Sequence, residues 1–139
     1  MALISVQNGE IGEYICALCL LKMGIPCRIV NMGTVDIVAE DQGRIWRIQV
    51  KSSVMKGNRR ANDTNMSYQF NTSKGKLKTP FSAEDCDIMA FVATDKDLVV
   101  FVPMPKLTRQ VTKRMSPKRF TLDESMKTWL DCMKYFNCR

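Results

Sequence analysis

The segment from Val35 to Ser53 carries an acid, an amide and a lysine in a pattern that could do chemistry. Strand alternation puts Asp36 on the polar side of the first half, and Gln49 and Lys51 on the polar side of the second. A carboxylate and an amide carbonyl are hard oxygen ligands of the kind that Mg²⁺ prefers, and a lysine beside them could position water or offset phosphate charge. An ordinary exposed hairpin face with mixed charge fits the same pattern.

A β-hairpin would bring these polar side chains together. If residues 42–43 form a two-residue turn, Asp41 faces Arg44 and the ladder places Asp36 opposite Gln49. Facing Cβ atoms on paired strands lie roughly 4.5–5.5 Å apart, so the polar groups would converge. A three-residue loop with a bulge would shift this register, and the sequence leaves that second arrangement open.

An amphipathic helix is predicted before the hairpin, with Asn8 as its N-cap and Gly24 at its end. Its expected apolar face consists of Ile11, Tyr14, Ile15, Leu18, Leu20 and Leu21. The acids Glu10 and Glu13 in its first turns suit the helix dipole. Glu13 could instead lean toward the hairpin as a metal or water contact, and its spacing does not decide between these roles.

Strands are predicted at residues 26–30, 66–71, 87–93 and 98–102. The last two are almost continuously apolar, which is typical of a sheet buried on both faces. A capping box at Thr121 opens a final helix with an apolar stripe that packs in the core or seals a dimer. The expectation is a single α/β domain over residues 1–139, with a mixed central β-sheet flanked by helices. The apolar residues of that last stripe are Met126, Trp129, Leu130 and Met133.

The composition points to a polyanionic partner, because the formal net charge is +7 and the pI is near 9.2. Nucleic acid is the first expectation and an acidic membrane the second. No apolar run approaches the roughly 20 residues that cross a bilayer, so an intracellular, cytoplasmic protein is expected. The chain has no histidine, which excludes hydrolases that use a histidine base. The basic residues expected to contact DNA phosphates are Lys56, Arg59, Arg60, Lys74, Lys76 and Lys78.

Cysteine usage favours structure over metal binding. Cys16 and Cys19 have a CxxC spacing, but they lie in an apolar helical run without a second CxxC. Without histidine, a zinc site is not expected, and the six cysteines are interpreted as small buried side chains in a reducing compartment.

Three segments in order resemble the core of the PD-(D/E)XK nuclease superfamily. They are NGEIGEYICALCLLKMGIPCRIV, VDIVAEDQGRIWRIQVKSS and, more weakly, TPFSAEDCDIMAFVATDKDLVVFVP, and they cover about residues 8–103. The chain is most similar to the bacterial branch of group I intron homing endonucleases and related PD-(D/E)XK endonucleases. Archaeal-type Holliday junction resolvases share the same arrangement. The resemblance implies a restriction-endonuclease-like core and a bacterial or phage-like source.

The resemblance also implies a role for each polar residue. Asp36 would be the main metal ligand, Glu13 a helix-borne acid near the metal or water, and Lys51 the catalytic lysine. Gln49 would occupy the second ligand position, helped by the Val50 carbonyl. Most members carry an acid where Gln49 stands, which leaves this site one negative charge short, although the homing branch is similar in carrying glutamine.

The expected function is a Mg²⁺-dependent DNA endonuclease, with Mn²⁺ able to substitute, acting as a homodimer or homotetramer. A homing-type enzyme would recognise a sequence. A junction resolvase would instead recognise shape and backbone. A nucleic-acid-binding protein without activity, on a decayed nuclease fold, is the remaining alternative.

Overall fold

The segment from 35 to 53 forms a hairpin in the computed structural model, which describes residues 2–54, 66–74, 77–107 and 111–137. Its strands are β2 (Val35–Asp41) and β3 (Arg44–Ser53). Gln42 and Gly43 have φ of 55° and 69°, as the two-residue turn of a twisted hairpin requires. The register pairs Asp41 with Arg44 and Ile37 with Ile48, as the two-residue turn predicts, but the paired residues end there and do not include the predicted pair of Asp36 with Gln49.

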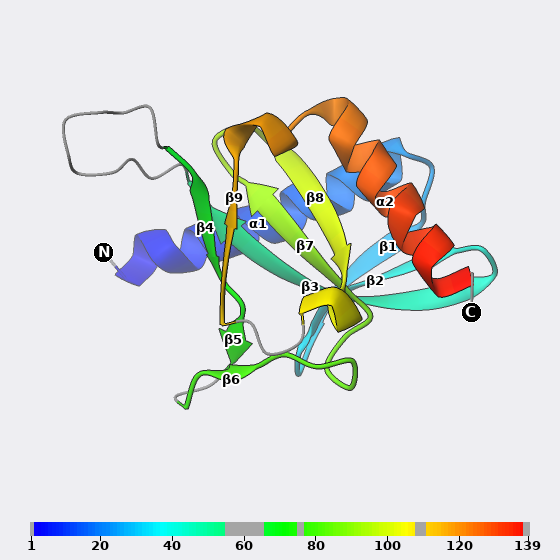
Figure 1. Cartoon of the computed structure of the whole chain (residues 1–139), viewed down its shortest axis with the longest axis horizontal. Helices are drawn as coiled ribbons and strands as arrows, with labels where there is room; N and C mark the ends of the chain where they lie inside the picture. The colour runs from blue at the N-terminus through cyan, green and yellow to red at the C-terminus, as the bar shows by residue number, and fades with distance from the viewer. Residues whose placement is uncertain (1, 55–65, 75–76, 108–110, 138–139) are drawn as a thin grey trace.

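A five-stranded mixed sheet forms the centre of the fold (Figure 1). Its order is β1-β2-β3-β7-β8, where β1 is Cys27–Met32, β7 is Ile88–Ala93 and β8 is Leu98–Pro103. The β3–β7 pair is parallel, and the other neighbours are antiparallel. Every residue of β7 is buried, which explains why its sequence does not alternate. The predicted mixed sheet of an α/β fold is confirmed.

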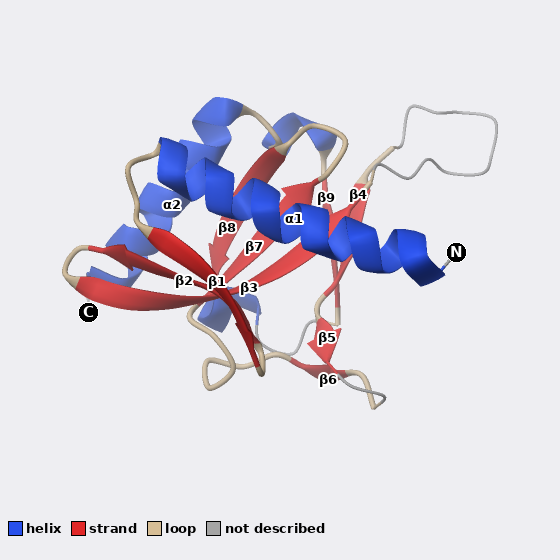
Figure 2. Cartoon of the chain, turned by 180° about the vertical axis from the view of Figure 1, so that it is seen from behind, coloured by secondary structure: helices blue, strands red, loops and turns tan. Residues whose placement is uncertain are grey.

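Both helices, α1 (Ala2–Lys22) and α2 (Leu122–Asn137), pack in one core on one face of this sheet. Seen from behind, α1 crosses the face of the sheet (Figure 2). No helix in the described part of the chain is long and apolar enough to span a membrane. Large side chains of this core include Leu20, Ile37, Trp46, Ile48, Ile88, Phe101 and Trp129.

The opposite face of the sheet is covered by a two-stranded ribbon, in which β4 (Tyr68–Asn71) pairs with β9 (Thr112–Met115). Tyr68 and Phe70 are buried there, so their predicted role in core packing is confirmed. The remaining short elements are β5 (Ser73–Lys74), β6 (Thr79–Pro80), and the 3₁₀ turns η2 (Met104–Leu107) and η3 (Pro117–Arg119).

The first helix differs from its prediction in its start and in its buried face. It begins at Ala2, so Asn8 lies inside it and is not its N-cap. The residues facing the sheet are Gly12, Cys16 and Leu20, spaced four apart on one face. The inward-facing residue nearest β3 is a glycine because α1 approaches Ser52 closely at Gly12. Four members of the predicted apolar face are exposed instead, namely Ile11, Tyr14, Leu18 and Leu21.

The second helix starts as predicted, because Thr121 Oγ1 accepts a hydrogen bond from the Glu124 backbone N–H. Its buried face also contains Ser125 and Thr128, which bond the backbone of the edge strand β8 at Val99 and Phe101. These bonds satisfy backbone groups that an edge strand leaves unpaired.

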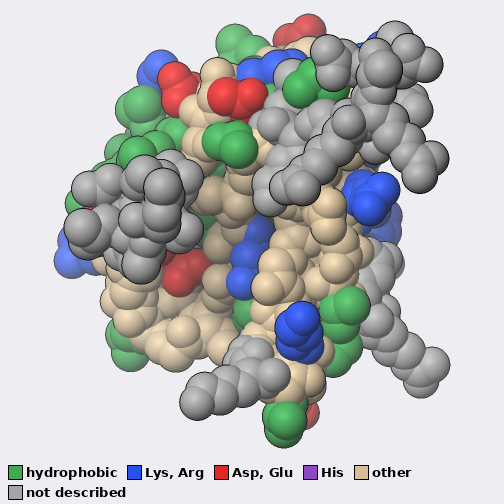
Figure 3. Space-filling model, turned by 90° about the vertical axis from the view of Figure 1, so that its left-hand side faces the viewer, with side chains coloured by type: hydrophobic (Ala, Val, Ile, Leu, Met, Phe, Trp, Pro, Cys, Tyr) green, Lys and Arg blue, Asp and Glu red, His purple; other side chains and the backbone are tan. Residues whose placement is uncertain are grey.

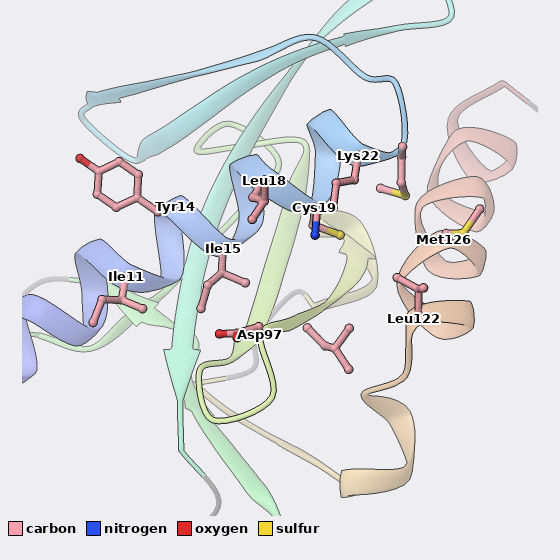
Figure 4. Close-up of a pocket in the computed structure, with 11 residues that line it drawn as sticks. Ile11, Tyr14, Ile15, Leu18, Cys19, Lys22, Asp97, Leu122 and Met126 are labelled. Carbon is pink, nitrogen blue, oxygen red and sulfur yellow. The ribbon is translucent and has the colours of Figure 1, made fainter.

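The predicted apolar stripe of α2 was wrong at two positions. Met126 and Leu130 are exposed, whereas Trp129 and Met133 are buried. Met126 lines an apolar groove between the outer side of α1 and the start of α2, with a volume of about 620 Å³ (Figure 4).

Candidate active site

The candidate site lies where β2 separates from β3. The pairing between these strands ends at Ile37 and Ile48, while the rest of β3 continues beside β7 on its other edge. The Val50 backbone N–H donates instead to Asp36 Oδ2, at 2.9 Å. The side chain of Asp36 therefore substitutes for a strand partner, and this bond fixes its carboxylate against the free edge of β3.

The carboxyl group of Asp36 is partly buried. Burial raises the pKa of its carboxyl group, while the Val50 N–H bond and the charge of Lys51 act in the opposite direction. Because these two effects only partly offset the loss of hydration, a nearby cation would stabilise the ionised carboxylate. Asp36 is thus suited to bind a metal ion.

Lys51 lies next to Asp36, on the side of β3 that faces the ribbon. Burial lowers the pKa of its ammonium group, and the charge of Asp36 acts against that shift. Lys51 Nζ lies 4.7 Å from the centre of the Phe81 ring, a distance that permits a cation–π interaction. Phe81 is buried in the core on the ribbon side of the sheet, so its ring is held in place against Lys51.

Gln49 and Val50 offer neutral oxygen atoms at the same place. Gln49 Nε2 donates to the Val50 carbonyl oxygen, at 3.4 Å, so the two predicted ligands are neighbours. This bond turns the amide nitrogen toward the carbonyl and leaves the amide oxygen of Gln49 free of that contact.

Glu13 reaches the site from α1. Burial raises the pKa of its carboxyl group, a hydrogen bond from the Asn31 side chain lowers it, and the charges of Asp36 and Glu10 raise it. Asp36 is therefore close enough to Glu13 for its charge to act on this carboxyl group. Figure 3 views the molecule from the side of the N-terminus and shows acidic and basic side chains beside each other in a hollow.

The donors present fit a hard divalent cation. Within the described ranges, no group of three or more His, Cys, Asp or Glu side chains could hold a metal ion. A cation here would rest on the carboxylates of Asp36 and Glu13 and on the neutral oxygens of Gln49 and Val50. All four are oxygen donors, as Mg²⁺ and Mn²⁺ prefer, and a positive charge between two acids with raised pKa values would relieve their repulsion.

Comparison with known proteins shows the family of this chain. The family model described as PD-(D/E)XK endonuclease matches residues 5–130. The chain belongs to the PD-(D/E)XK endonuclease family. Membership makes DNA nuclease its class of activity.

A solved structure supports the same fold. It is a bacterial homing endonuclease, I-Ssp6803I, which superposes with a TM-score of 0.68 at 16% sequence identity and covers 96% of this chain and 95% of its own. No curated protein matches the sequence. At this level of identity the structural likeness concerns the fold of the PD-(D/E)XK core alone.

Two of the lysines predicted to bind DNA lie in the described part of the nuclease. Lys74 forms an ion pair with Asp85, which is mostly buried. Burial by itself would raise the pKa of Asp85, but Lys74 and the Ser82 N–H lower it overall. Lys74 therefore already has a structural partner, whereas Lys78 lies at a turn with φ of 51°. The other four candidates, Lys56, Arg59, Arg60 and Lys76, lie outside the described residues.

Sequence reasoning missed three contributors to this nuclease site. Asn31 lies in β1, beyond the strand predicted at residues 26–30, and it lowers the pKa of Glu13. Phe81 supports Lys51 from a distant segment that carries no local signal. Gly12 packs on Ser52, and its position directly before Glu13 was the one available hint of a close approach.

Proposed function

We propose that this protein is a Mg²⁺-dependent endonuclease that hydrolyses DNA phosphodiester bonds at specific sites, in the manner of a homing enzyme. The observation that carries the proposal is the Asp36 carboxylate fixed at the edge of β3, where the charge of Lys51 acts on it and where it acts on Glu13 of α1. Mn²⁺ substitutes for Mg²⁺, because both ions accept oxygen donors in similar sites.

Each residue has one task in this proposal. Asp36, Glu13, the amide oxygen of Gln49 and the carbonyl of Val50 hold the cation. When bound, the cation offsets phosphate charge and lowers the pKa of water. Lys51 donates hydrogen bonds to the phosphate or to the attacking water from its position above Phe81. Partial burial lowers the effective dielectric constant around Asp36 and Lys51, and this strengthens these charge interactions.

The type of substrate is tested with three DNAs in the presence of Mg²⁺. A duplex library of high sequence complexity, a linear duplex of one sequence, and a synthetic four-way junction are incubated with the protein, and the cut ends are sequenced. A site-specific enzyme yields recurrent ends from the library. Cleavage of junctions of arbitrary sequence, with linear duplex spared, would establish the resolvase alternative. Binding without cleavage of any of the three would leave a nucleic-acid-binding protein.

Gln49→Glu is expected to tighten divalent metal binding, because it returns a negative charge to the site. An added attraction of about 1.4 kcal/mol lowers the half-saturating Mg²⁺ concentration roughly tenfold. Calorimetric titration with Mn²⁺ and a Mg²⁺ series of cleavage rates measure this effect. Gln69→Glu is the matched control, because Gln69 is an exposed residue of β4. Equal metal affinity in wild type and Gln49→Glu would exclude Gln49 from the metal site.

DNA contact by the basic residues is tested by its salt dependence. Replacing Arg59 and Arg60 with alanine should weaken DNA binding and reduce the salt slope by about 2, since each lost phosphate contact removes about 0.9. Binding is measured in EDTA to prevent cleavage. Lys127→Ala with Lys134→Ala on α2 removes the same charge on a helix that does not carry the site. An unchanged slope in the arginine variant would mean that these residues do not contact phosphate.

The enzyme acts as a homodimer or homotetramer, because cutting both strands of a duplex takes two sites. Support comes from the apolar groove of α1 and α2, where Tyr14, Leu18 and Leu122 are 67%, 52% and 64% exposed. Lys22 and Asp97 line the same groove, so a two-fold arrangement could pair Lys22 of one copy with Asp97 of the other (Figure 4).

Light scattering after gel filtration tests this assembly. Leu18→Glu places a charge in the groove and should convert the oligomer to a monomer. Leu77→Glu is the control, because Leu77 is 91% exposed and is not part of the groove. A monomeric wild type, or a Leu18→Glu variant of unchanged mass, would contradict the assembly.

A further inference from the structure

Lys51 does not pair with the acid beside it. The charge of Asp36 acts on Lys51, yet none of the ion pairs among the described residues includes either side chain. Opposite charges attract strongly where water is partly excluded, so a half-buried lysine gains by contacting a neighbouring carboxylate. The ammonium nitrogen of Lys51 lies instead 4.7 Å from the centre of the Phe81 ring. The ring therefore competes with the carboxylate for this cation.

The sheet directs Lys51 onto a core of aromatic rings. Lys51 of β3 pairs with Phe91 of β7, and paired residues of neighbouring strands point to the same side of a sheet. Phe91 and Phe81 are both buried in the core on the ribbon side. A ring attracts a cation through its face, and this contact does not use up the N–H donors of the ammonium group. Lys51 is thus held while its donors stay available to other groups.

Phe81 begins a segment, residues 81–87, that hydrogen bonds hold in place. The Phe81 backbone N–H donates to the Thr72 carbonyl oxygen, at 3.4 Å. The carboxylate of Asp85 accepts a hydrogen bond from the Ser82 backbone N–H, at 2.8 Å, and pairs with Lys74 of β5. These contacts fix the backbone on both sides of the ring.

Further hydrogen bonds join the 81–87 segment to both arms of the hairpin. The hydroxyl group of Thr34, two residues before Asp36, donates to the Asp85 carbonyl oxygen, at 2.7 Å. The guanidinium group of Arg47 in β3 donates to two backbone carbonyl oxygens of the segment, at 2.9 and 3.0 Å. The Phe81 ring therefore has a fixed position relative to the strands that carry Asp36 and Lys51.

We propose that Phe81 is a positioning residue for Lys51: the face of its ring holds the ammonium group away from the Asp36 carboxylate. The inference rests on the proposed function, in which Asp36 holds the cation and Lys51 acts on phosphate or water. An ammonium group paired with Asp36 would occupy an oxygen that the cation needs and an N–H donor that the phosphate needs. Phe81 acts through Lys51 and needs no contact with the metal or DNA.

Phe81→Leu removes the aromatic face and keeps a large apolar side chain in the core. Phe120→Leu is the matched control, because Phe120 is buried in the same core beside Tyr68. Mn²⁺ affinity is measured by calorimetry for wild type, both leucine variants, Lys51→Met, and the double variant Phe81→Leu with Lys51→Met. Phe81→Leu should weaken Mn²⁺ binding about fivefold, which corresponds to about 1 kcal/mol of lost cation–π attraction, and Phe120→Leu should leave it unchanged.

The effect of Phe81→Leu on Mn²⁺ affinity should depend on the lysine. Lys51→Met should bind Mn²⁺ at least as tightly as wild type, because no ammonium group then competes for Asp36. Adding Phe81→Leu to Lys51→Met should change nothing further. A Phe81→Leu effect that persisted at full size in Lys51→Met, or equal weakening by Phe120→Leu, would overturn the inference and reduce Phe81 to a packing residue.

A nuclear magnetic resonance measurement in EDTA tests the contact without any metal or DNA. The Cε proton signals of Lys51, assigned by their loss in Lys51→Met, should be shifted upfield in wild type by the ring of Phe81. They should move toward the position of a free lysine in Phe81→Leu and stay in place in Phe120→Leu. Unshifted wild-type signals would overturn the inference, even if Phe81→Leu failed to fold. Absence of Mn²⁺ binding or of DNA cleavage by wild type would defeat the proposed function, and the ring shift would still decide whether Phe81 holds Lys51.

Discussion

Asp36→Asn is expected to reduce the rate of metal-dependent DNA cleavage about a thousandfold. The substitution removes the main charged ligand of the proposed site, and metal ions supply several kcal/mol of transition-state stabilisation. Each 1.4 kcal/mol corresponds to a factor of ten in rate, so a loss of about 4 kcal/mol gives this magnitude. The variant should stay folded, because the amide oxygen of asparagine can still accept the hydrogen bond that the Val50 N–H donates to Asp36.

Single-turnover rates on a cleaved substrate measure this loss, and thermal unfolding in EDTA shows whether the variant is folded. Asp131→Asn makes the same change on the exposed side of α2 and should keep the rate of wild type. A folded Asp36→Asn enzyme that retained more than a tenth of the rate would remove Asp36 from the centre of the mechanism.

Gly12→Ala is expected to destabilise the protein by about 1–2 kcal/mol. A Cβ atom at residue 12 overlaps Ser52 Oγ at 1.7 Å, and the Ser52 Cβ at 3.0 Å remains in the way after the hydroxyl rotates. Overpacking of this kind costs about 1–3 kcal/mol, of which the better helix propensity of alanine recovers up to about 1 kcal/mol. The helix must move outward and takes Glu13 with it, so cleavage should also slow by about tenfold or more.

Gly9→Ala is the control in the same helix, since a Cβ atom there meets nothing within 4 Å. It should stabilise the protein by about 0.5–1 kcal/mol. Ser52→Gly removes both atoms that obstruct residue 12. In that background Gly12→Ala should behave like Gly9→Ala in chemical denaturation, and a Gly12→Ala cost that persisted there would mean that Ser52 is not the obstacle.

The hairpin could be predicted from sequence because local rules determine it. The alternation of its arms assigns Asp36, Gln49 and Lys51 to polar positions, and Gly43 favours a two-residue turn. Once the turn length is known, the register follows by counting, and the structure has that register. The capping box at Thr121 is equally local, and it too was confirmed.

The helix faces could not be predicted in the same way, because hydrophobicity does not determine how closely two elements approach. The larger apolar side chains of α1, such as Tyr14 and Leu18, suggested the wrong buried face. Gly12 and Cys16 face the sheet because only small side chains fit against β3. The contact of Lys51 with Phe81 joins segments far apart in the sequence, so no local pattern predicts it.

The most direct test of the metal site uses paramagnetic Mn²⁺ and isotope-labelled protein, and it needs no knowledge of the DNA target. Substoichiometric Mn²⁺ should broaden the backbone signal of Val50 and the side-chain amide signals of Gln49 before all others, because these groups lie beside Asp36. The broadening should disappear in Asp36→Asn. Broadening centred elsewhere in the protein, or equal broadening in wild type and Asp36→Asn, would contradict a metal site built on Asp36.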